Sequence, residues 1–303
     1  MSLLRALDRF WYMPAPAARL AVLRALVGSY ALVYLLIRSL SLTAVTSFDP
    51  ASFEPVGPVR LLAAPLPTWL VQLAVGLACL SGAAFVGGFR YRISAPLFAL
   101  TFLWVTSYRS SWGMIFHTEN LVALHLLLLA AAPAADAFSF DARAAAWPQV
   151  ASGRYGWAIR AISTITVASY ALAGVAKLRL AGTSWAGGDV LRAQVAYDNL
   201  RKIELGSTHS PLGAWLVVYA WPFRGLAWVS LALELGAPLA LLGGPVARLW
   251  VLGAFSFHIG VVALMAIGFP YQLSLIAYAS FFPLERALDL PAWRRLRARL
   301  AKK

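Results

Sequence analysis

Long apolar segments, separated by short connections that contain arginine, proline or glycine, run along almost the whole chain. The longest segments have about 20 residues each, enough for a helix to cross the hydrocarbon core of a bilayer. A backbone in lipid must satisfy its own hydrogen bonds, so these segments are expected to be α-helices. A shorter stretch, 270–283, could cross while tilted, join the preceding helix or re-enter the membrane. The predicted spans are about 19–40, 68–88, 93–110, 118–135, 156–178, 224–243 and 248–268.

Arginine in the connections predicts the orientation of these spans. The connections 89–92, 136–154 and 244–248 all carry arginine, and short cytoplasmic connections hold an excess of basic residues. If 270–283 is counted as a span, these three connections all fall on the cytoplasmic side. The long connection 179–212 departs from this rule because it is also basic. The predicted fold class is therefore all-α, a polytopic transmembrane helical bundle of about eight spans (six to eight), with both termini cytoplasmic.

Three segments outside the spans have their own patterns. Residues 1–18 mix charged, aromatic and apolar positions and predict a short interfacial helix that ends near Pro14. Residues 41–67 hold five prolines and predict an irregular outer loop. A second interfacial helix is expected over part of 189–205.

Composition places the whole chain in the membrane class. Of 303 residues, 61% are hydrophobic and only 13% are charged, whereas a soluble domain has about a quarter charged residues. We therefore predict a single transmembrane domain over 1–303, retained in the cell inner (plasma) membrane as a multi-pass protein. The single cysteine, Cys79, excludes an internal disulfide bond.

The net charge of +14 is concentrated near the chain ends. Arg19 and Arg24 stand at the start of the first span, and residues 286–303 form a basic tail that we expect to be cytoplasmic. Basic residues that flank spans set topology and attract anionic lipid. Membrane lipid, and no nucleic acid, is therefore the expected partner of these charges.

Lys177 lies at the end of the apolar segment 156–178, where a charge is costly. One interpretation is an anchor that extends its amine to the headgroups. The other is a base. The chain uses arginine at 22 positions and lysine at four, and arginine anchors equally well but does not release its proton. This choice of residue favours the base.

A second polar group, His117, Glu119 and Asn120, opens the span 118–135. His117 and Asn120 are three residues apart and would share a helix face. The alternative is a hydrated helix start whose polar side chains satisfy free backbone donors.

Glu234 and His258 fall near the middle of two consecutive spans. Ionisable groups at this depth usually face the bundle interior, where they pair or line a pathway. A structural hydrogen bond from Glu234 to a histidine or an arginine is the simplest interpretation. The four histidines show no metal-ligand spacing, so no metal site is predicted.

Several of these stretches, taken in order, resemble one known family. They are His117-Thr-Glu-Asn-Leu121, Pro133 to Asp141, Tyr170-x-x-Ala-Gly-Val-x-Lys-Leu178 followed by Trp185-x-Gly-Gly, and Phe257-His258 followed by Met265-x-Ile-Gly-Phe269. Together they are similar to the HTTM (horizontally transferred transmembrane) domain shared with vitamin K-dependent gamma-carboxylase. The resemblance covers about residues 15–285.

The resemblance implies a quinol-driven enzyme. In the carboxylase, the lysine that matches Lys177 deprotonates reduced vitamin K, and the histidine that matches His117 assists. The anion reacts with dioxygen to give an epoxide and a strong alkoxide base, which removes a proton from the gamma carbon of glutamate so that carbon dioxide adds. The carboxylase has a second lysine where this chain has Ala176, and it continues into a large extramembrane part. We therefore expect the quinol reaction to carry over more directly than the carboxylation.

The implied cofactor is reduced vitamin K or menaquinol, with dioxygen and carbon dioxide as co-substrates. The implied partners are a lipid quinone and a peptide or protein substrate. The residues expected to line the substrate and quinone pocket beside the catalytic pair are Trp112, Glu119, Asn120, Tyr170, Trp185, Glu234 and His258.

Two other classes of function stay open at this point. A proton-coupled transporter or channel would use Glu234 and His258 as a relay at mid-membrane. A non-enzymatic membrane scaffold would use the polar residues for structure alone. Exchange of Lys177 for arginine separates a scaffold from an enzyme, because an anchor tolerates arginine and a base does not.

Overall fold

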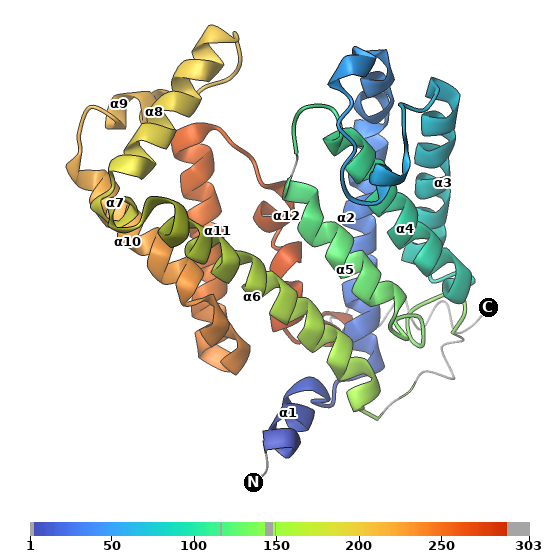
Figure 1. Ribbon diagram of the computed structural model, residues 1–303. Helices are drawn as coiled ribbons and strands as arrows, with labels where there is room; N and C mark the ends of the chain where they lie inside the picture. The colour runs from blue at the N-terminus through green and yellow to red at the C-terminus, as the bar shows by residue number, and fades with distance from the viewer. Residues whose placement is uncertain (1–2, 116, 143–147, 149, 290–303) are drawn as a thin grey trace. The chain divides into compact units, whose positions relative to one another are not determined.

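Helices make up most of the chain in the computed structural model, which describes residues 3–115, 117–142, 148 and 150–289 (Figure 1). The α-helices are α1 (Leu3–Trp11), α2 (Ala17–Ala44), α3 (Thr68–Gly87), α4 (Tyr91–Ser110), α5 (Asn120–Ala130), α6 (Gly153–Ala181), α7 (Thr183–Gly187), α8 (Asp189–Glu204), α9 (Pro211–Leu216), α10 (Trp221–Leu235), α11 (Gly244–Met265) and α12 (Pro270–Leu273). Short 3-10 helices occupy Val45–Ser47, Pro50–Ser52, Gly57–Leu61, His117–Glu119, Ala237–Leu242, Ile276–Phe281 and Leu284–Asp289.

The chain divides into two compact units. The first contains residues 1–162 and 282–303, and the second contains residues 163–281. The helix α6 contributes its first part to the first unit and its remainder to the second. Most of the basic tail predicted at 286–303 lies outside the described residues.

In the first unit, α2, α3 and α4 pack side by side, and α5 lies against α2 and α4 (Figure 1). Small residues allow this close approach, as is usual between membrane helices. A Cβ atom added at Gly28 would lie 2.6 Å from the ring of Phe85, and one added at Gly82 would lie 2.7 Å from the ring of Phe98. Both glycines therefore make room for an aromatic ring of a neighbouring helix.

Arg24 is the largest fully buried side chain among the described residues, with 1% of its surface exposed. Its guanidinium donates hydrogen bonds to the carbonyl oxygens of Ala134 (2.9 Å), Phe138 (2.6 Å) and Val86 (3.2 Å). The pattern of charges placed Arg24 at the start of a span as a flanking residue. It instead attaches the segment after α5 to α2 and to the end of α3.

The same segment also caps α4. The carboxylate of Asp141 accepts hydrogen bonds from the backbone N–H groups of Arg90 (2.8 Å) and Tyr91 (2.7 Å), at the start of α4. Gly88 and Arg90 adopt left-handed backbone conformations, with φ of 63° and 43°. These two residues reverse the chain within the short connection between α3 and α4.

A bidentate ion pair joins Arg19, at the start of α2, to Glu285. The two Arg19–Glu285 hydrogen bonds are each 2.7 Å long. Partial burial raises the pKa of the Glu285 carboxyl, but the hydrogen bonds from Arg19 outweigh this effect and the pKa is lowered overall. A lowered carboxyl pKa stabilises the folded state above the ordinary pKa of glutamate, and this contribution is lost as the pH falls through the lowered value.

We therefore expect the segment 284–289 to detach from α2 at acid pH. Hydrogen exchange of this segment, taken relative to the intrinsic exchange rate at each pH, should accelerate as the pH falls from about 4.5 to about 3, through the lowered pKa of Glu285. Glu285→Gln, which has no carboxyl to titrate, is the control and should show a smaller acceleration. Equal acceleration in both proteins would contradict this role of Glu285.

In the second unit, α7, α8, α9, α10 and α11 pack around one another. Trp185 of α7 is buried against Ala227 and Leu231 of α10. Asn199 of α8 donates a hydrogen bond to the carbonyl oxygen of Leu264 (2.9 Å), and Lys202 donates one to that of Met265. These bonds satisfy carbonyl groups at the end of α11, which would otherwise lack helical partners.

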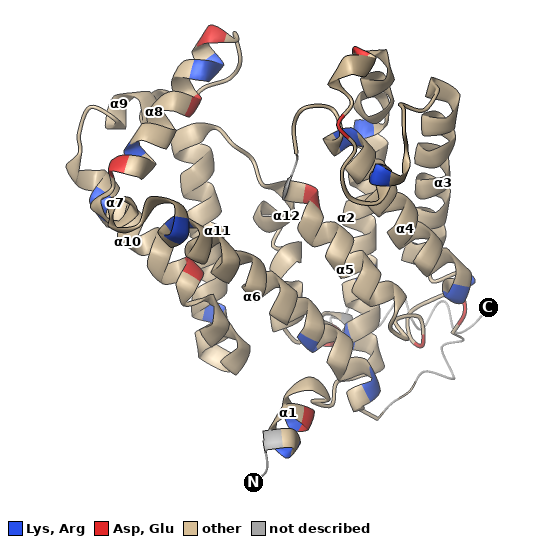
Figure 2. Ribbon diagram, in the orientation of Figure 1, with Lys and Arg blue, Asp and Glu red and all other residues tan. Residues whose placement is uncertain are grey.

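Four of the described helices are long and apolar enough to cross a membrane. They are the helix that runs over Ala17–Ser47 with its terminal turn, α3, α6 and α11. In Figure 2, α3 has no charged residue along its whole length. This is a membrane protein with an all-helical fold in the described residues, as predicted, while the count of eight spans and the cytoplasmic placement of both termini stay predictions.

Three predicted spans do not form one continuous helix of membrane length. The stretch 118–135 contains only the 11-residue α5, about 16 Å long at 1.5 Å per residue. The stretch 224–243 changes at Gly236 from α10 to a 3-10 helix that contains Pro238. The stretch 270–283 holds the four-residue α12 and a separate 3-10 helix. Each interruption contains or adjoins a proline, or is held by contacts from distant segments.

Candidate functional site

Lys177 lies inside the second unit, paired with Glu234. The distance from Lys177 Nζ to Glu234 Oε1 is 2.6 Å, and the two side chains are 19% and 4% exposed. The amine therefore points toward a buried carboxylate of α10 and does not extend freely from α6. This geometry disfavours the interpretation of Lys177 as an anchor that extends toward headgroups.

Two aromatic rings also contact the amine. Lys177 Nζ lies 4.7 Å from the ring centre of Trp185 and 5.5 Å from that of Phe257. The Trp185 ring is buried, and its indole N–H donates to the hydroxyl of Ser230 at 3.3 Å. Aromatic faces attract a cation and shield the amine from water. Lys177, Glu234 and Trp185, three of the predicted site residues, therefore come together.

Gly174 allows Glu234 to approach α6 closely. A Cβ atom added at Gly174 would lie 3.0 Å from Cβ of Glu234 and 3.0 Å from a methyl group of Leu235. Residues 170, 174 and 177 share one face of a helix, because residues three and four apart are neighbours. Glu234 thus lies against α6 midway between Tyr170 and Lys177.

Tyr170 belongs to a second buried cluster, two turns from Lys177 along α6. Its hydroxyl lies 2.7 Å from His258 Nε2 and 2.5 Å from the hydroxyl of Tyr278. The ring of Trp250 lies against both tyrosines, at 5.1 and 6.0 Å between ring centres. This hydrogen-bonded chain joins α6, α11 and the 3-10 helix Ile276–Phe281.

The contact predicted between Glu234 and a histidine or an arginine is wrong, because the ion-pair partner of Glu234 is Lys177. His258 bonds to Tyr170 instead. Glu234 of α10 pairs with Lys177, and His258 of α11 bonds to Tyr170. Lys177 and Tyr170 lie on the same face of α6. A direct Glu234–His258 relay, on which the transporter hypothesis depended, is therefore not formed.

The remaining predicted site residues belong to the first unit. Glu119 pairs with Arg109 at 3.3 Å and accepts a hydrogen bond from Thr118 at 2.7 Å. Asn120 is exposed at the start of α5. His117 lies in the 3-10 turn before α5, and its side chain is outside the described residues. The joint action of His117 and Lys177 stays a prediction.

Trp112 has a structural environment that the sequence did not indicate. It is buried with Val45, Val59, Val71 and Tyr108. This apolar cluster attaches the proline-rich segment after α2 to α3 and α4. We therefore describe Trp112 as a core residue of the first unit.

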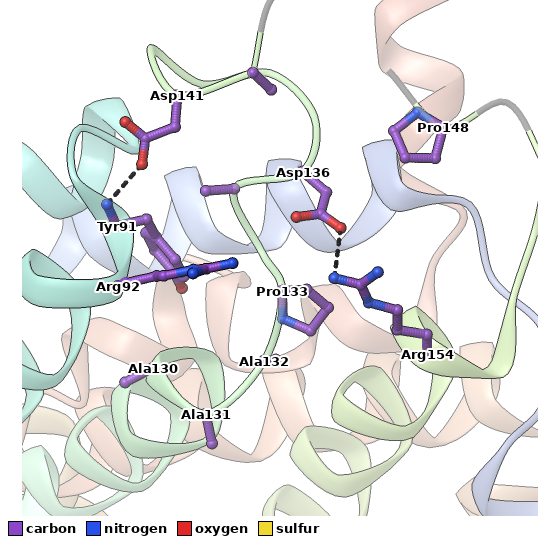
Figure 3. Close-up of a pocket in the computed structure, with 12 residues that line it drawn as sticks. Tyr91, Arg92, Ala130, Ala131, Ala132, Pro133, Asp136, Asp141, Pro148 and Arg154 are labelled. Carbon is purple, nitrogen blue, oxygen red and sulfur yellow. Dashed lines mark hydrogen bonds and ion pairs between the residues drawn. The ribbon is translucent and has the colours of Figure 1, made fainter. Parts of the chain in front are cut away.

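A cavity of about 930 Å³ opens in the first unit near the start of α4, the end of α5 and the start of α6 (Figure 3). Arg154 pairs there with Asp136 at 3.2 Å, and Asp141 is occupied by the backbone at the start of α4. The lining contains none of the predicted site residues. We therefore take the Lys177 cluster, which consists of Lys177, Glu234, Trp185, Phe257 and Ser230, as the candidate site rather than this cavity.

Four members of the Lys177 and Tyr170 clusters were not among the predicted site residues: Phe257, Ser230, Tyr278 and Trp250. Phe257 stands in the Phe-His pair of the family motif, which was the available signal. Ser230 and Tyr278 lie in apolar stretches where a hydroxyl alone does not indicate its partner. No group of three His, Cys, Asp or Glu side chains suited to a metal ion occurs among the described residues.

These features define a helical membrane protein with a partly buried lysine–glutamate pair whose amine contacts two aromatic rings. The HTTM domain model matches residues 12–285, so the chain belongs to the HTTM family. This membrane domain family includes the membrane domain of the carboxylase. The resemblance expected from the sequence is therefore confirmed over nearly the whole chain. A search of curated proteins and a search of solved structures found no match.

Proposed function

We propose that this HTTM chain is an enzyme of the inner (plasma) membrane that takes a proton from a lipid quinol and drives its oxygen-dependent epoxidation, with Lys177 as the base. One observation carries the proposal: the Lys177 amine is held by one carboxylate and covered by two aromatic rings. A general base must be free of its own proton and screened from water when it acts. The contacts of Lys177 with Trp185 and Phe257 support the second condition, and Glu234 offers an acceptor for the proton of the amine.

Glu234 provides a place for the proton of Lys177. A hydrogen bond of 2.6 Å joins Nζ to Oε1, so transfer of one proton converts the ammonium and carboxylate into an amine and a carboxylic acid. In a poorly hydrated interior, two neutral groups avoid the desolvation cost that two charges carry. The amine then has a lone pair that accepts the hydroxyl proton of the quinol.

The rings of Trp185 and Phe257 also suit a flat, aromatic substrate. Pockets for small molecules are lined mainly by apolar and aromatic groups with a few polar atoms that orient the ligand. Reduced vitamin K or menaquinol is the substrate class we propose, with dioxygen as co-substrate. Carboxylation of a glutamate in a peptide or protein by carbon dioxide is the proposed coupled reaction.

The test is turnover by the purified protein in lipid nanodiscs that contain menaquinol or reduced vitamin K. We expect oxygen uptake and one epoxide formed for each quinol consumed, and no epoxide without protein or without oxygen. Addition of a glutamate-rich peptide and labelled carbon dioxide tests the coupled reaction separately. Absence of epoxide with every quinol would refute the proposed function.

A further inference from the structure

The cavity in the first unit combines charged walls with many small side chains (Figure 3). Its volume of about 930 Å³ lies in the range of pockets that bind small molecules, about 300 to 1,000 Å³. The small residues of its lining are Ala130, Ala131, Ala132, Pro133, Ala135 and Ala142. None of these side chains is long enough to fill the space between the charged residues, so the cavity stays open.

Both carboxylates of the lining already have hydrogen-bond donors. Asp136 Oδ2 accepts the hydroxyl of Tyr155 at 3.0 Å and pairs with Arg154 Nη2 at 3.2 Å. The two oxygens of Asp141 accept the backbone N–H groups at the start of α4, at 2.8 and 2.7 Å. Neither carboxylate therefore depends on a ligand for its donors.

Two guanidinium groups of the lining retain unused donors. Arg92 of α4 is exposed, and it forms no hydrogen bond or ion pair with any of the described residues. Arg154, at the start of α6, uses Nη2 for Asp136, and its side chain is 65% exposed. A guanidinium has five N–H donors, so most of those on Arg154 are also unused. Figure 3 shows Arg92 extending from α4 toward the side of the cavity that Arg154 lines.

We propose that this cavity binds a phosphate group through Arg92 and Arg154. An anion rich in acceptors matches a pocket whose donors are unused and whose acceptors are occupied. Guanidinium groups form paired hydrogen bonds with carboxylate or phosphate oxygens. A planar carboxylate presents two oxygens to one side, whereas a tetrahedral phosphate directs its oxygens to several sides and meets donors from both helices. The site is separate from the Lys177 cluster and does not depend on the proposed function.

Contacts within the first unit fix the walls of this cavity. Arg24 holds the carbonyl groups of Ala134 and Phe138, in the segment that carries Asp136. Just before α6, Ser152 exchanges two backbone hydrogen bonds with Ala15, at 3.1 and 3.0 Å. A site whose walls are fixed in advance pays less ordering entropy when a ligand binds.

Two sources carry a phosphate group: a phospholipid headgroup and a free phosphate compound. The candidate span α6 begins at the cavity, and headgroups lie at the ends of membrane helices. The connections 89–92 and 136–154 beside it carry arginine and are predicted to be cytoplasmic, where anionic lipid attracts basic residues. A free phosphate compound has the same group, so each source needs its own probe.

Calorimetric titration of the purified chain in a phosphate-free maltoside detergent tests the site. The probes are inorganic phosphate and dihexanoyl phosphatidic acid, a soluble lipid with the same group, and acetate is the carboxylate control. We expect at least one phosphate probe to bind, and acetate to bind more weakly. Binding of the lipid alone would assign the site to a headgroup. Binding of inorganic phosphate, with or without the lipid, would assign it to a free phosphate compound.

Arg92→Gln is the decisive variant, because Arg92 has no contact among the described residues that holds the fold. We expect it to raise Kd about 10- to 100-fold, the loss typical of one charged hydrogen-bond partner. Arg154→Gln tests the other wall and should also raise Kd. Arg90→Gln is the matched control, since it removes the same charge two positions earlier and Arg90 does not line the cavity.

Three results would overturn the phosphate site. The first is that neither phosphate probe binds to the unmodified chain. The second is that Arg92→Gln and Arg90→Gln have the same Kd, which would mean that only the general charge of this connection matters. The third is tighter binding of acetate than of either phosphate probe. An unfolding temperature for each variant equal to that of the unmodified chain shows that a changed Kd does not come from unfolding.

Discussion

Replacing Lys177 with arginine is expected to lower the rate of quinol epoxidation by about 100- to 10,000-fold, the usual contribution of a positioned general base. The guanidinium can keep the ion pair with Glu234 and the contacts with Trp185 and Phe257. It does not lose its proton, so it cannot accept one from the quinol. The measurement is epoxide formed per minute at saturating menaquinol in nanodiscs.

Lys202→Arg is the matched control for this experiment. Lys202 also belongs to the second unit and also pairs with a carboxylate, Asp198, at 2.8 Å. Its amine bonds to the end of α11 and takes no part in the Lys177 cluster. We expect Lys202→Arg to keep the epoxidation rate. Retained activity in Lys177→Arg, with unfolding temperature unchanged, would show that the lysine is a structural cation and not a base.

Replacing Arg24 with methionine is expected to cause a large loss of stability in the first unit. The change removes the donor of three hydrogen bonds and leaves the carbonyl groups of Ala134, Phe138 and Val86 without it. A buried polar group that loses its partner costs about 1 to 3 kcal/mol. Several such groups lose theirs together, so the expected destabilisation is at least about 3 kcal/mol. Thermal unfolding in detergent micelles measures it.

Arg38→Met controls for the loss of a charge from the same helix. Arg38 is exposed on α2, so its removal should change the unfolding temperature little. A similar small change in Arg24→Met would mean that the segment 131–142 is held by other contacts. Asp141 at the start of α4 would then be the first residue to examine, because it attaches the same segment.

The sequence predicted the helices whose formation depends on local apolar length. The segments 19–40, 68–88, 156–178 and 248–268 correspond to α2, α3, α6 and α11, which are also the candidate membrane spans. A continuous apolar run in lipid has few alternatives to a helix. Helices also form near the N-terminus and over 189–205, as α1 and α8, while their interfacial placement stays a prediction.

Helix ends set by distant contacts could not be predicted in this way. The span 118–135 ends early at Ala130, because the chain after it is held by Arg24, more than 100 positions earlier. Local pattern gave no sign of this bond. The interruptions at Gly236 and after Leu273 did have a local signal, the prolines nearby, but a proline is also tolerated inside a membrane helix.

The sequence predicted which residues belong to the candidate site better than it predicted which of them contact each other. Lys177, Glu234 and Trp185 were all named from the sequence, and they do come together. The partner of Glu234 was wrong, because 57 positions separate it from Lys177 and the rotation of α10 relative to α6 is set by packing. Charge and depth identify the groups that need a partner, while packing decides which partner they find.

Residue 174 is a glycine, and its lack of a side chain allows close contact with Glu234, which is far away in the sequence. A methyl group there would lie 3.0 Å from Cβ of Glu234 and push the acidic group away from the amine. Aligned relatives are therefore expected to change these two sites together: a bulkier residue three positions before the lysine should accompany loss of the acid on the later helix. In such relatives the lysine would need a different counter-ion, and with it a different route for its proton.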